Sequence, residues 1–254
     1  TNGVGVGKGV CPNILAGRNL DGSEIPDRLL GIGWYTSDQP GHWRQDPISL
    51  IPKAIGAYWS KVLPFVMKSS AQFHAPAPPP LTSTTYTSAF NETKSLGGDG
   101  VNTRTERTGD QTFIGIYWAY DGTPSLCAPP RLYNQIAVQV ADDTNLPPLQ
   151  LARLLALGNG AMADAAIACW ESKYYWDYWR PVTAIREDDP GTGPTGKGDG
   201  NPNTHGDVTF SPLGGPASNL SGPDFTPPFP SYPSVHATIG GAFFEVLRRF
   251  YVTD

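Results

Sequence analysis

Two cationic side chains seven positions apart are the groups in this sequence best suited to bind an anion. Lys173 and Arg180 lie within residues 170–181, which also contain six Trp and Tyr side chains. If both cations lie on one helical run, the spacing is two turns, which places them on one face about 10 Å apart at their Cα atoms. Pro181 disfavours helical backbone at Arg180 and so predicts that Arg180 lies at a helix end. For this stretch alone, an exposed cationic face among interfacial aromatic side chains is the alternative.

Ser234, Val235 and His236 offer complementary groups at the start of a predicted helix. Backbone N–H groups in the first turn of a helix have no intrahelical partner and can bind anions. The Ser234 hydroxyl, the Val235 amide and the two cations therefore suit one tetrahedral oxoanion, and an imidazole beside it can transfer a proton near neutral pH. An ordinary N-cap and a surface histidine are the alternatives. The short spacing between Ser234 and His236 disfavours a serine hydrolase.

The composition argues against nucleic-acid binding and against a membrane-spanning protein. The 254 residues carry a net charge of -5, which provides no global basic field for nucleic acid. Only 16% of residues are charged, whereas 29 are Gly and 26 are Pro, which predicts long ordered loops. No apolar run reaches the roughly 18 residues that span a bilayer, so we expect no membrane span. The sequence begins at Thr1, which leaves open an upstream segment that has been removed, and also the compartment.

The three cysteines match no zinc-binding spacing. Cys11 and Cys127 lie in loop-like sequence and could form a disulfide, whereas Cys169 lies in a run of small residues and is expected to be a buried thiol.

Hydrophobic periodicity predicts an all-α protein, a helix bundle with long Gly- and Pro-rich loops. We expect residues 1–46 to form an irregular N-terminal arm. Residues 47–254 are expected to form a helical domain that is incomplete at its C-terminal end. The predicted helices cover residues 47–67, 83–94, 107–120, a stretch that starts at 129, 149–178 and 236–251. Residues 187–234 lack a regular pattern, and ordered loops of this length are usually functional lids or rims.

Two spaced motifs carry a resemblance to a known family. Lys173-x6-Arg180-Pro181 and Pro233-Ser234-Val235-His236-Ala237 resemble the first two signature elements of the superfamily of vanadium-dependent haloperoxidases and type 2 phosphatidic-acid phosphatases. Residues 104–250 resemble the haloperoxidase branch, on the segments 113–122, 129–135, 179–186 and 227–234. The resemblance implies a helix bundle of the haloperoxidase type.

The resemblance also implies a cofactor and a reaction. Vanadate is bound in this family by residues that correspond to Lys173, Arg180, Ser234 and the Val235 amide, and His236 is the acid–base group. Lys173 has a second, catalytic role, because it polarises the bound oxidant. The implied activity is oxidation of halide by hydrogen peroxide to hypohalous acid, which halogenates organic substrates.

Trp170 and Phe229 occupy positions where chloride-oxidising members of the family carry the same residue types. By this resemblance they form the halide pocket, and the apolar environment implies oxidation of chloride as well as bromide.

The sequence departs from the family pattern at two points. Val235 stands where the family has Gly, which adds bulk and disfavours a positive φ. The third element, which contains the histidine that coordinates vanadium, does not follow His236. We therefore expect no metal ligand in this chain, an axial histidine on a C-terminal companion chain, and assembly as a homo-oligomer.

Two other functions remain open from the sequence. A phosphatase of the same superfamily would use the same cradle, because vanadate resembles the transition state of phosphoryl transfer. A catalytically silent helical subunit would explain Val235 and the missing histidine.

Overall fold

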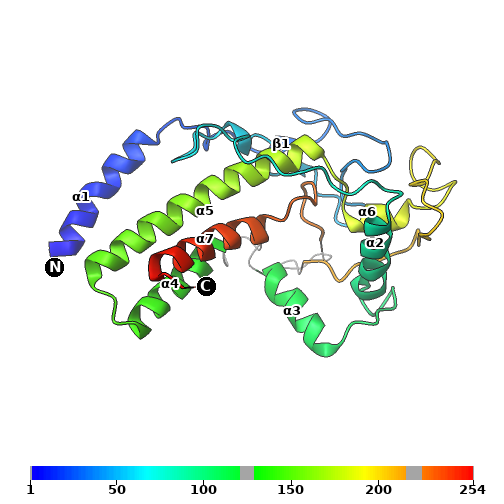
Figure 1. Cartoon of the computed structure of the whole chain (residues 1–254). Helices are drawn as coiled ribbons and strands as arrows, with labels where there is room; N and C mark the ends of the chain where they lie inside the picture. The colour runs from blue at the N-terminus through cyan, green and yellow to red at the C-terminus, as the bar shows by residue number, and fades with distance from the viewer. Residues whose placement is uncertain (1, 121–128, 216–224, 254) are drawn as a thin grey trace.

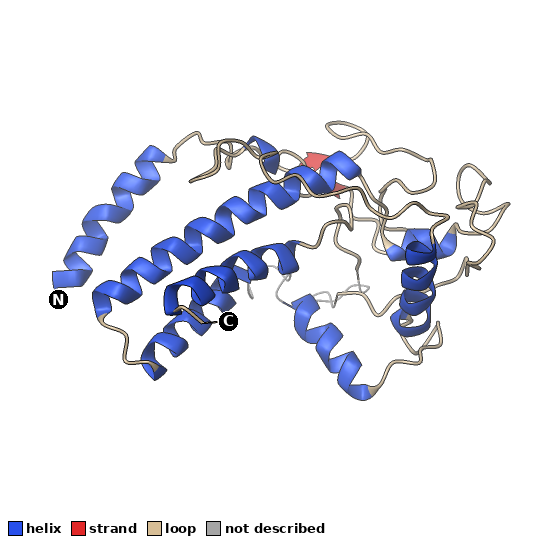
Figure 2. Ribbon diagram, viewed as in Figure 1, coloured by secondary structure: helices blue, strands red, loops and turns tan. Residues whose placement is uncertain are grey.

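Helices dominate the structure, as the sequence predicts. The computed structural model of the chain describes residues 2–120, 129–215 and 225–253. Within these ranges there are seven α-helices, and the two strands contain only two residues each (Figure 2). The all-α prediction is therefore confirmed.

Three helices form the bundle that carries most of the packing. The central helix α5 (Pro148–Trp176) packs along α7 (Val235–Tyr251) and against α4 (Pro129–Asp143) (Figure 1). Their shared core includes Tyr133, Leu154 and Phe243. Gly158 allows close approach, since a Cβ there would lie 3.2 Å from the Phe243 ring. Pro148 begins α5 at a position where its missing N–H costs no hydrogen bond.

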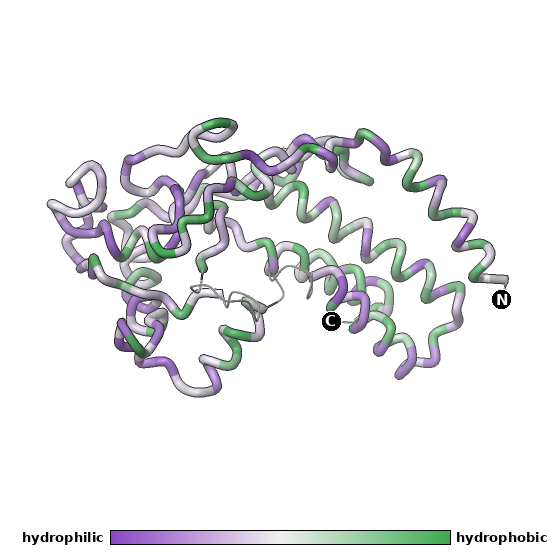
Figure 3. The backbone as a smooth tube through the Cα atoms, turned by 180° about the vertical axis from the view of Figure 1, so that it is seen from behind, coloured by the Kyte–Doolittle hydropathy of each residue, from purple (hydrophilic) through white to green (hydrophobic). Residues whose placement is uncertain are grey.

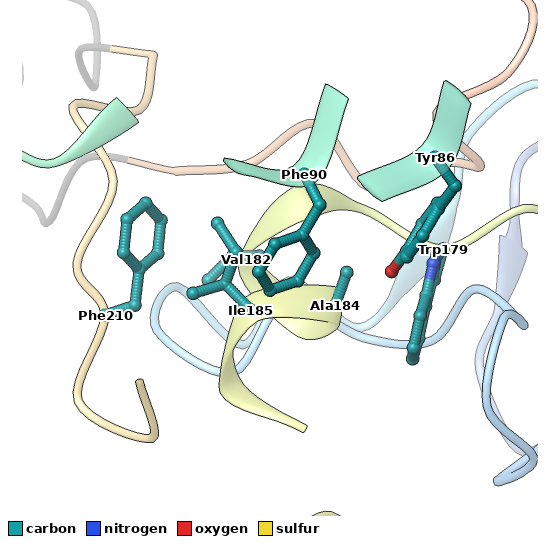
Figure 4. Close-up of a cluster of buried hydrophobic side chains, with 7 residues drawn as sticks. All are labelled: Tyr86, Phe90, Trp179, Val182, Ala184, Ile185 and Phe210. Atoms are coloured by element: carbon teal, nitrogen blue, oxygen red, sulfur yellow. The ribbon is translucent and has the colours of Figure 1, made fainter. Parts of the chain in front are cut away.

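A smaller layer lies at the opposite end of the molecule from α4 (Figure 1). Helix α2 (Thr84–Gly97) begins at Ser83, whose hydroxyl accepts a hydrogen bond from the Tyr86 amide, and it packs on the short helix α6 (Pro181–Arg186). A cluster of buried side chains joins the two helices to the following loop (Figure 4): Tyr86, Phe90, Trp179, Val182, Ala184, Ile185 and Phe210. This cluster fixes α6 and therefore the residue before it, Arg180.

The prediction of an irregular N-terminal arm is wrong for the first part of residues 1–46. Residues Asn2–Gly17 form helix α1, which is exposed along nearly its whole length. Glycines at positions 3, 5, 7 and 9 have low helix propensity and concealed this helix from the sequence analysis. The rest of the arm is mainly turns, and strand β1 (Arg28–Leu29) pairs with β2 (Lys53–Ala54).

The prediction of a helix over residues 47–67 is also wrong. This stretch contains β2, turns and the short 3₁₀ helix η1 (Trp59–Lys61). Its end is bound to α5, because the Asp164 carboxylate accepts hydrogen bonds from the amides of residues 65, 66 and 67 at 2.6, 2.8 and 2.8 Å. These tertiary bonds use amides that a helix would pair internally, and they override the helical period of the apolar residues.

The other predicted helices are confirmed as α2, α3 (Gly109–Tyr120), α4, α5 and α7. The buried face of α4 differs from the expected one, since Tyr133, Ala137 and Ala141 are buried while Val138 is 39% exposed. In the described parts of residues 187–234 there is no helix or strand, in agreement with the long-loop prediction.

Helix α5 is the one described helix with the length and apolar composition to cross a membrane, which is weak evidence by itself. It packs against α4 and α7, and hydrophilic residues are interspersed along the bundle helices (Figure 3). Cys169 is buried, as predicted, and Cys11 is exposed. Cys127, its predicted partner, lies outside the described residues.

A glycine at a close approach of two segments provides a test of this packing. Gly56 has φ +71°, and a Cβ there would lie 2.7 Å from the Trp170 ring, whereas Gly31 has φ +76° and open space. Gly31→Ala should lower the free energy of unfolding by about 1–2 kcal/mol through backbone strain alone. Gly56→Ala should lose roughly a further 1–3 kcal/mol through overpacking. Urea denaturation measures both, and equal losses would contradict the packing.

Candidate anion site

The two predicted cations lie on different helices. Helix α5 ends at Trp176, because Asp177 adopts left-handed backbone (φ 48°, ψ 40°) and donates its amide to the Lys173 carbonyl. Arg180 is the extended N-cap residue of α6, and Pro181 follows it in the first turn. The prediction of one shared helical run is therefore wrong, whereas the position of Arg180 at a helix end is confirmed.

Both cations nevertheless bind the same segment. The Lys173 ammonium donates hydrogen bonds to the carbonyls of Pro230 and Ser231 at 2.8 and 3.0 Å. The Arg180 Nε donates to the carbonyl of Phe229 at 2.7 Å. Three consecutive carbonyls, which sequence reasoning did not identify, thus bring together side chains from α5 and α6.

This segment leads directly to Ser234. Two residues separate Ser231 from Ser234, so their Cα atoms are at most about 11 Å apart. The Cys169 thiol, one turn before Lys173 on α5, makes a weak hydrogen bond to the Pro233 carbonyl at 3.7 Å. Ser234 therefore lies beside the last turns of α5, close to both cations.

Ser234 is the N-cap of helix α7, as the alternative to an anion-binding role predicts. Its hydroxyl oxygen accepts a hydrogen bond from the Ala237 amide at 3.3 Å, which leaves the hydroxyl proton able to donate to an anion. The amides of the first turn, including that of Val235, lack intrahelical partners, and the helix dipole adds partial positive charge there.

Val235 begins α7 with helical backbone, so this position does not use the positive φ that a glycine would permit. Its side chain packs against the bundle core around Tyr133 and Phe243. The added bulk therefore contributes to the core.

His236 is half-buried in the first turn of α7. Its ring contacts Trp118 of α3 edge to face, with 6.0 Å between the ring centroids. The Tyr133 hydroxyl donates to the His236 carbonyl at 3.4 Å. These contacts orient the residue from α3 and α4.

Burial of the cations dominates the electrostatics of the site. Lys173 is 1% exposed, and burial, with the charge of Arg180, lowers its pKa to about 7. Burial also lowers the pKa of Arg180 to about 10. Among the described residues no ion pair joins either cation to a carboxylate, and the buried Nη2 of Arg180 has no hydrogen-bond partner. A tetrahedral oxoanion would satisfy this donor and offset the buried charge.

One carboxylate near the site was missed by the sequence analysis. Asp46 is buried and opposes the effect of burial on the pKa of Arg180. It accepts hydrogen bonds from the amides of Ile48, Ser49 and Thr226, so it also positions the approach to residue 229. Asp46 lies in a stretch without a regular hydrophobic pattern, so the sequence did not indicate that it would be buried near Arg180.

The structure brings the two predicted halide-pocket residues next to the cations. The rings of Trp170 and Phe229 meet edge to face at 4.8 Å. Phe229 also lies 5.3 Å from the Lys173 ammonium and 4.5 Å from the Arg180 guanidinium, measured to its ring centroid. The apolar surroundings are present, and their role toward halide stays a prediction.

A large groove in the described structure lies elsewhere. This groove, of about 1090 Å³, separates α5 and α7 from residues 66–75. Cys169 and Pro233 line one part of it, whereas Lys173, Arg180, Ser234 and His236 do not. Volume therefore does not mark the candidate anion site, which is identified by its unsatisfied buried donors.

Two histidines have carboxylate partners away from these donors. His42 pairs with Asp177 at 3.0 Å, and His74 pairs with Glu171 at 2.7 Å. Across the residues that the structure covers, no cluster of three or more His, Cys, Asp or Glu side chains could hold a metal ion. The axial ligand outside this chain stays a prediction.

Comparisons with known proteins agree with this geometry. The sequence profile of the VCPO second helical-bundle domain matches residues 153–254. Vanadium chloroperoxidase of Curvularia inaequalis is 38% identical over 175 residues, which are 65% of this chain and 27% of that protein. The crystal structure of a bacterial vanadium-dependent iodoperoxidase superposes with a TM-score of 0.65 and 26% identity, over 92% of this chain and 50% of that one.

The fold defines an all-α protein, and its unsatisfied donors are of the types that could hold an oxoanion. The chain is a relative of the vanadium haloperoxidases, as its two motifs predict. It spans about a quarter of the chloroperoxidase and half of the iodoperoxidase.

The lowered pKa of Lys173 predicts proton uptake when an anion binds. At about pH 8 the free amine is mostly neutral, and a bound anion favours the ammonium, so the protein takes up nearly one proton. At about pH 6 the amine is already charged and the uptake disappears. Calorimetric titration with tungstate, in buffers that differ in ionisation enthalpy, measures it.

The control is Lys173→Met, which has no titrating group and should bind tungstate without buffer-dependent heat. Equal uptake by this variant and the parent protein would contradict the assignment to Lys173.

Proposed function

We propose that this chain forms the vanadate-binding half of a haloperoxidase that oxidises halide with hydrogen peroxide to hypohalous acid. One observation carries the proposal: buried Lys173 and partly buried Arg180 lack a carboxylate partner among the described residues and lie beside the start of α7. Vanadate, when bound, supplies a Lewis acid that activates peroxide without a change of metal oxidation state.

The residues fit vanadate by their donor types. Arg180 Nη2 is buried without a partner, and Lys173 has one N–H left after its two bonds to carbonyls. The Ser234 hydroxyl and the Val235 amide would supply the remaining donors. Because α5, α6 and α7 each contribute at a helix end, the cradle is fixed before the anion arrives.

His236 is proposed to move the proton. Its imidazole lies in the same turn as the Val235 amide, and Trp118 holds the ring edge to face. A neutral imidazole can accept a proton from peroxide, and the protonated form can return one to the departing oxygen.

Lys173 is proposed to have a second role, polarising the bound oxidant. Burial excludes water from its ammonium, which strengthens the remaining N–H bond to an oxygen that gains negative charge. Trp170 and Phe229 are proposed to form the apolar wall at which halide arrives, poorly solvated and therefore more reactive.

The axial histidine is proposed to come from outside these 254 residues, on a companion chain, within a homo-oligomeric assembly. Helix α3 supports an additional covering surface, because its apolar side chains are exposed in the described structure, with Phe113 at 71%. The others are Ile114, Ile116, Tyr117 and Trp118. Covering α3 would also enclose His236 through Trp118.

Halogenation of a dimedone-type probe tests the function. Vanadate-loaded protein, assayed with the companion chain, should halogenate the probe with bromide and with chloride at mildly acidic pH. Phe229→His adds a polar ring to the apolar wall and should lower the chloride rate by about tenfold while bromide is less affected.

His236→Ala is the matched variant, and it should lower both rates by about 10²–10⁴-fold while vanadate remains bound. Bromide turnover without any chloride turnover would contradict the proposed halide pocket. Absence of turnover with every halide would contradict the enzyme function.

A further inference from the structure

A pair of carboxylates lies in the loop after α6, away from the cations of the anion site. Asp188 and Asp199 are both buried, and their backbones are joined by a hydrogen bond from the Asp199 amide to the Asp188 carbonyl at 2.9 Å. Burial and the Asp199 carboxylate raise the pKa of Asp188 to about 7. The two carboxyl groups are therefore neighbours within one loop.

The Asp188 carboxylate is unsatisfied. It is 3% exposed, and neither of its oxygens has a partner with hydrogen-bond geometry, although Asp199 and the Thr204 hydroxyl are close enough to affect its pKa. No ion pair in the described part of the chain involves Asp188 or Asp199. An unpaired buried carboxylate costs several kcal/mol, so a folded chain needs something that offsets this charge.

Helix α2 supplies a further polar group to the region around the two carboxylates. Tyr86 of α2 is buried, and its hydroxyl has no hydrogen-bond partner. Burial raises the pKa of Tyr86, and so do the charges of Asp199 and Asp188. The loop that carries Asp199 also contacts the start of α2, because the Asn201 side-chain amide donates to the Thr87 hydroxyl at 2.8 Å. Figure 4 shows the Tyr86 hydroxyl on the inner side of the cluster, next to Trp179.

Neutral polar groups lie next to the Asp199 carboxylate. Thr204 is buried, and its hydroxyl donates to the Asn201 carbonyl at 3.1 Å; it lies 3.4 Å from an Asp199 oxygen, which therefore remains available. The other Asp199 oxygen accepts the Asn201 amide at 2.7 Å.

We propose that Asp188 and Asp199 bind a divalent cation of the calcium type, with Tyr86 and Thr204 as neutral oxygen neighbours. Calcium accepts six to eight oxygen ligands in irregular geometry, including bidentate carboxylates and main-chain carbonyls, which a loop of this kind provides. Two carboxylates match its charge. The ion fixes residues 188–204 onto α2, and it thereby supports α6 and the position of Arg180 at its start.

Terbium luminescence and thermal unfolding test the site without vanadate or halide. Terbium is a calcium substitute that is excited through nearby aromatic rings, here Tyr86 of the proposed site and Trp179 next to it in the buried cluster. Titration of the chelator-treated protein should give saturable luminescence that calcium displaces. Calcium should also raise the melting temperature by several degrees at a concentration well above its Kd.

Asp188→Asn is the test variant, since it keeps the shape, removes the buried charge and should lose both responses without a lower melting temperature in chelator. Asp207→Asn is the control in the same loop, where the carboxylate binds Thr209, and it should retain both responses. Equal responses in Asp188→Asn would overturn the proposal. Stabilisation by acid or sodium alone, without a calcium effect, would also overturn it by showing that a proton or a monovalent ion offsets the charge.

Discussion

Removal of the Lys173 ammonium and the Arg180 Nη2 from solvent, without a carboxylate partner in the described structure, is the constraint on which the rest of the site depends. Lys173 and Arg180 obtain their hydrogen bonds from three consecutive carbonyls at residues 229–231. Those bonds fold the segment before α7 across the ends of α5 and α6. The interaction that satisfies the cations therefore also places Ser234 and the first turn of α7 beside them, and one buried guanidinium nitrogen remains for a ligand.

The architecture explains why the site consists of helix ends. A single long helix would hold Lys173 and Arg180 at a fixed spacing, but the left-handed Asp177 ends α5 and lets Arg180 approach from a separate direction. The aromatic cluster around Trp179 fixes α6, and α7 is fixed by its contact with α5. Since the site lies where three rigid elements end, its donors are positioned before any anion binds, which limits the reorganisation cost of binding.

The sequence predicted what local chemistry determines. Ser83 and Ser234 are capping residues with an apolar period behind them, and the helices that they begin were predicted close to their observed bounds. The four candidate oxoanion donors were identified from two spaced motifs, and the structure brings the segments that carry them together. Tertiary contacts could not be predicted from the sequence. The hydrogen bonds to Asp164 that replace a helix over residues 47–67, and those from the cations to carbonyls, join positions about 50 to 100 residues apart. Helix α1 was missed because its glycines oppose its observed conformation.

Vanadate binding measured by equilibrium dialysis tests the central claim most directly. Arg180 and Arg186 lie at the two ends of α6, and each donates its Nε to one carbonyl, of Phe229 and Phe210 respectively. Arg180→Met should weaken vanadate binding by about 10- to 100-fold, the effect of losing charge-assisted hydrogen bonds, whereas Arg186→Met should leave it unchanged. Equal affinity of the Arg180→Met variant and the parent protein would contradict the assignment of this cradle as an oxoanion site.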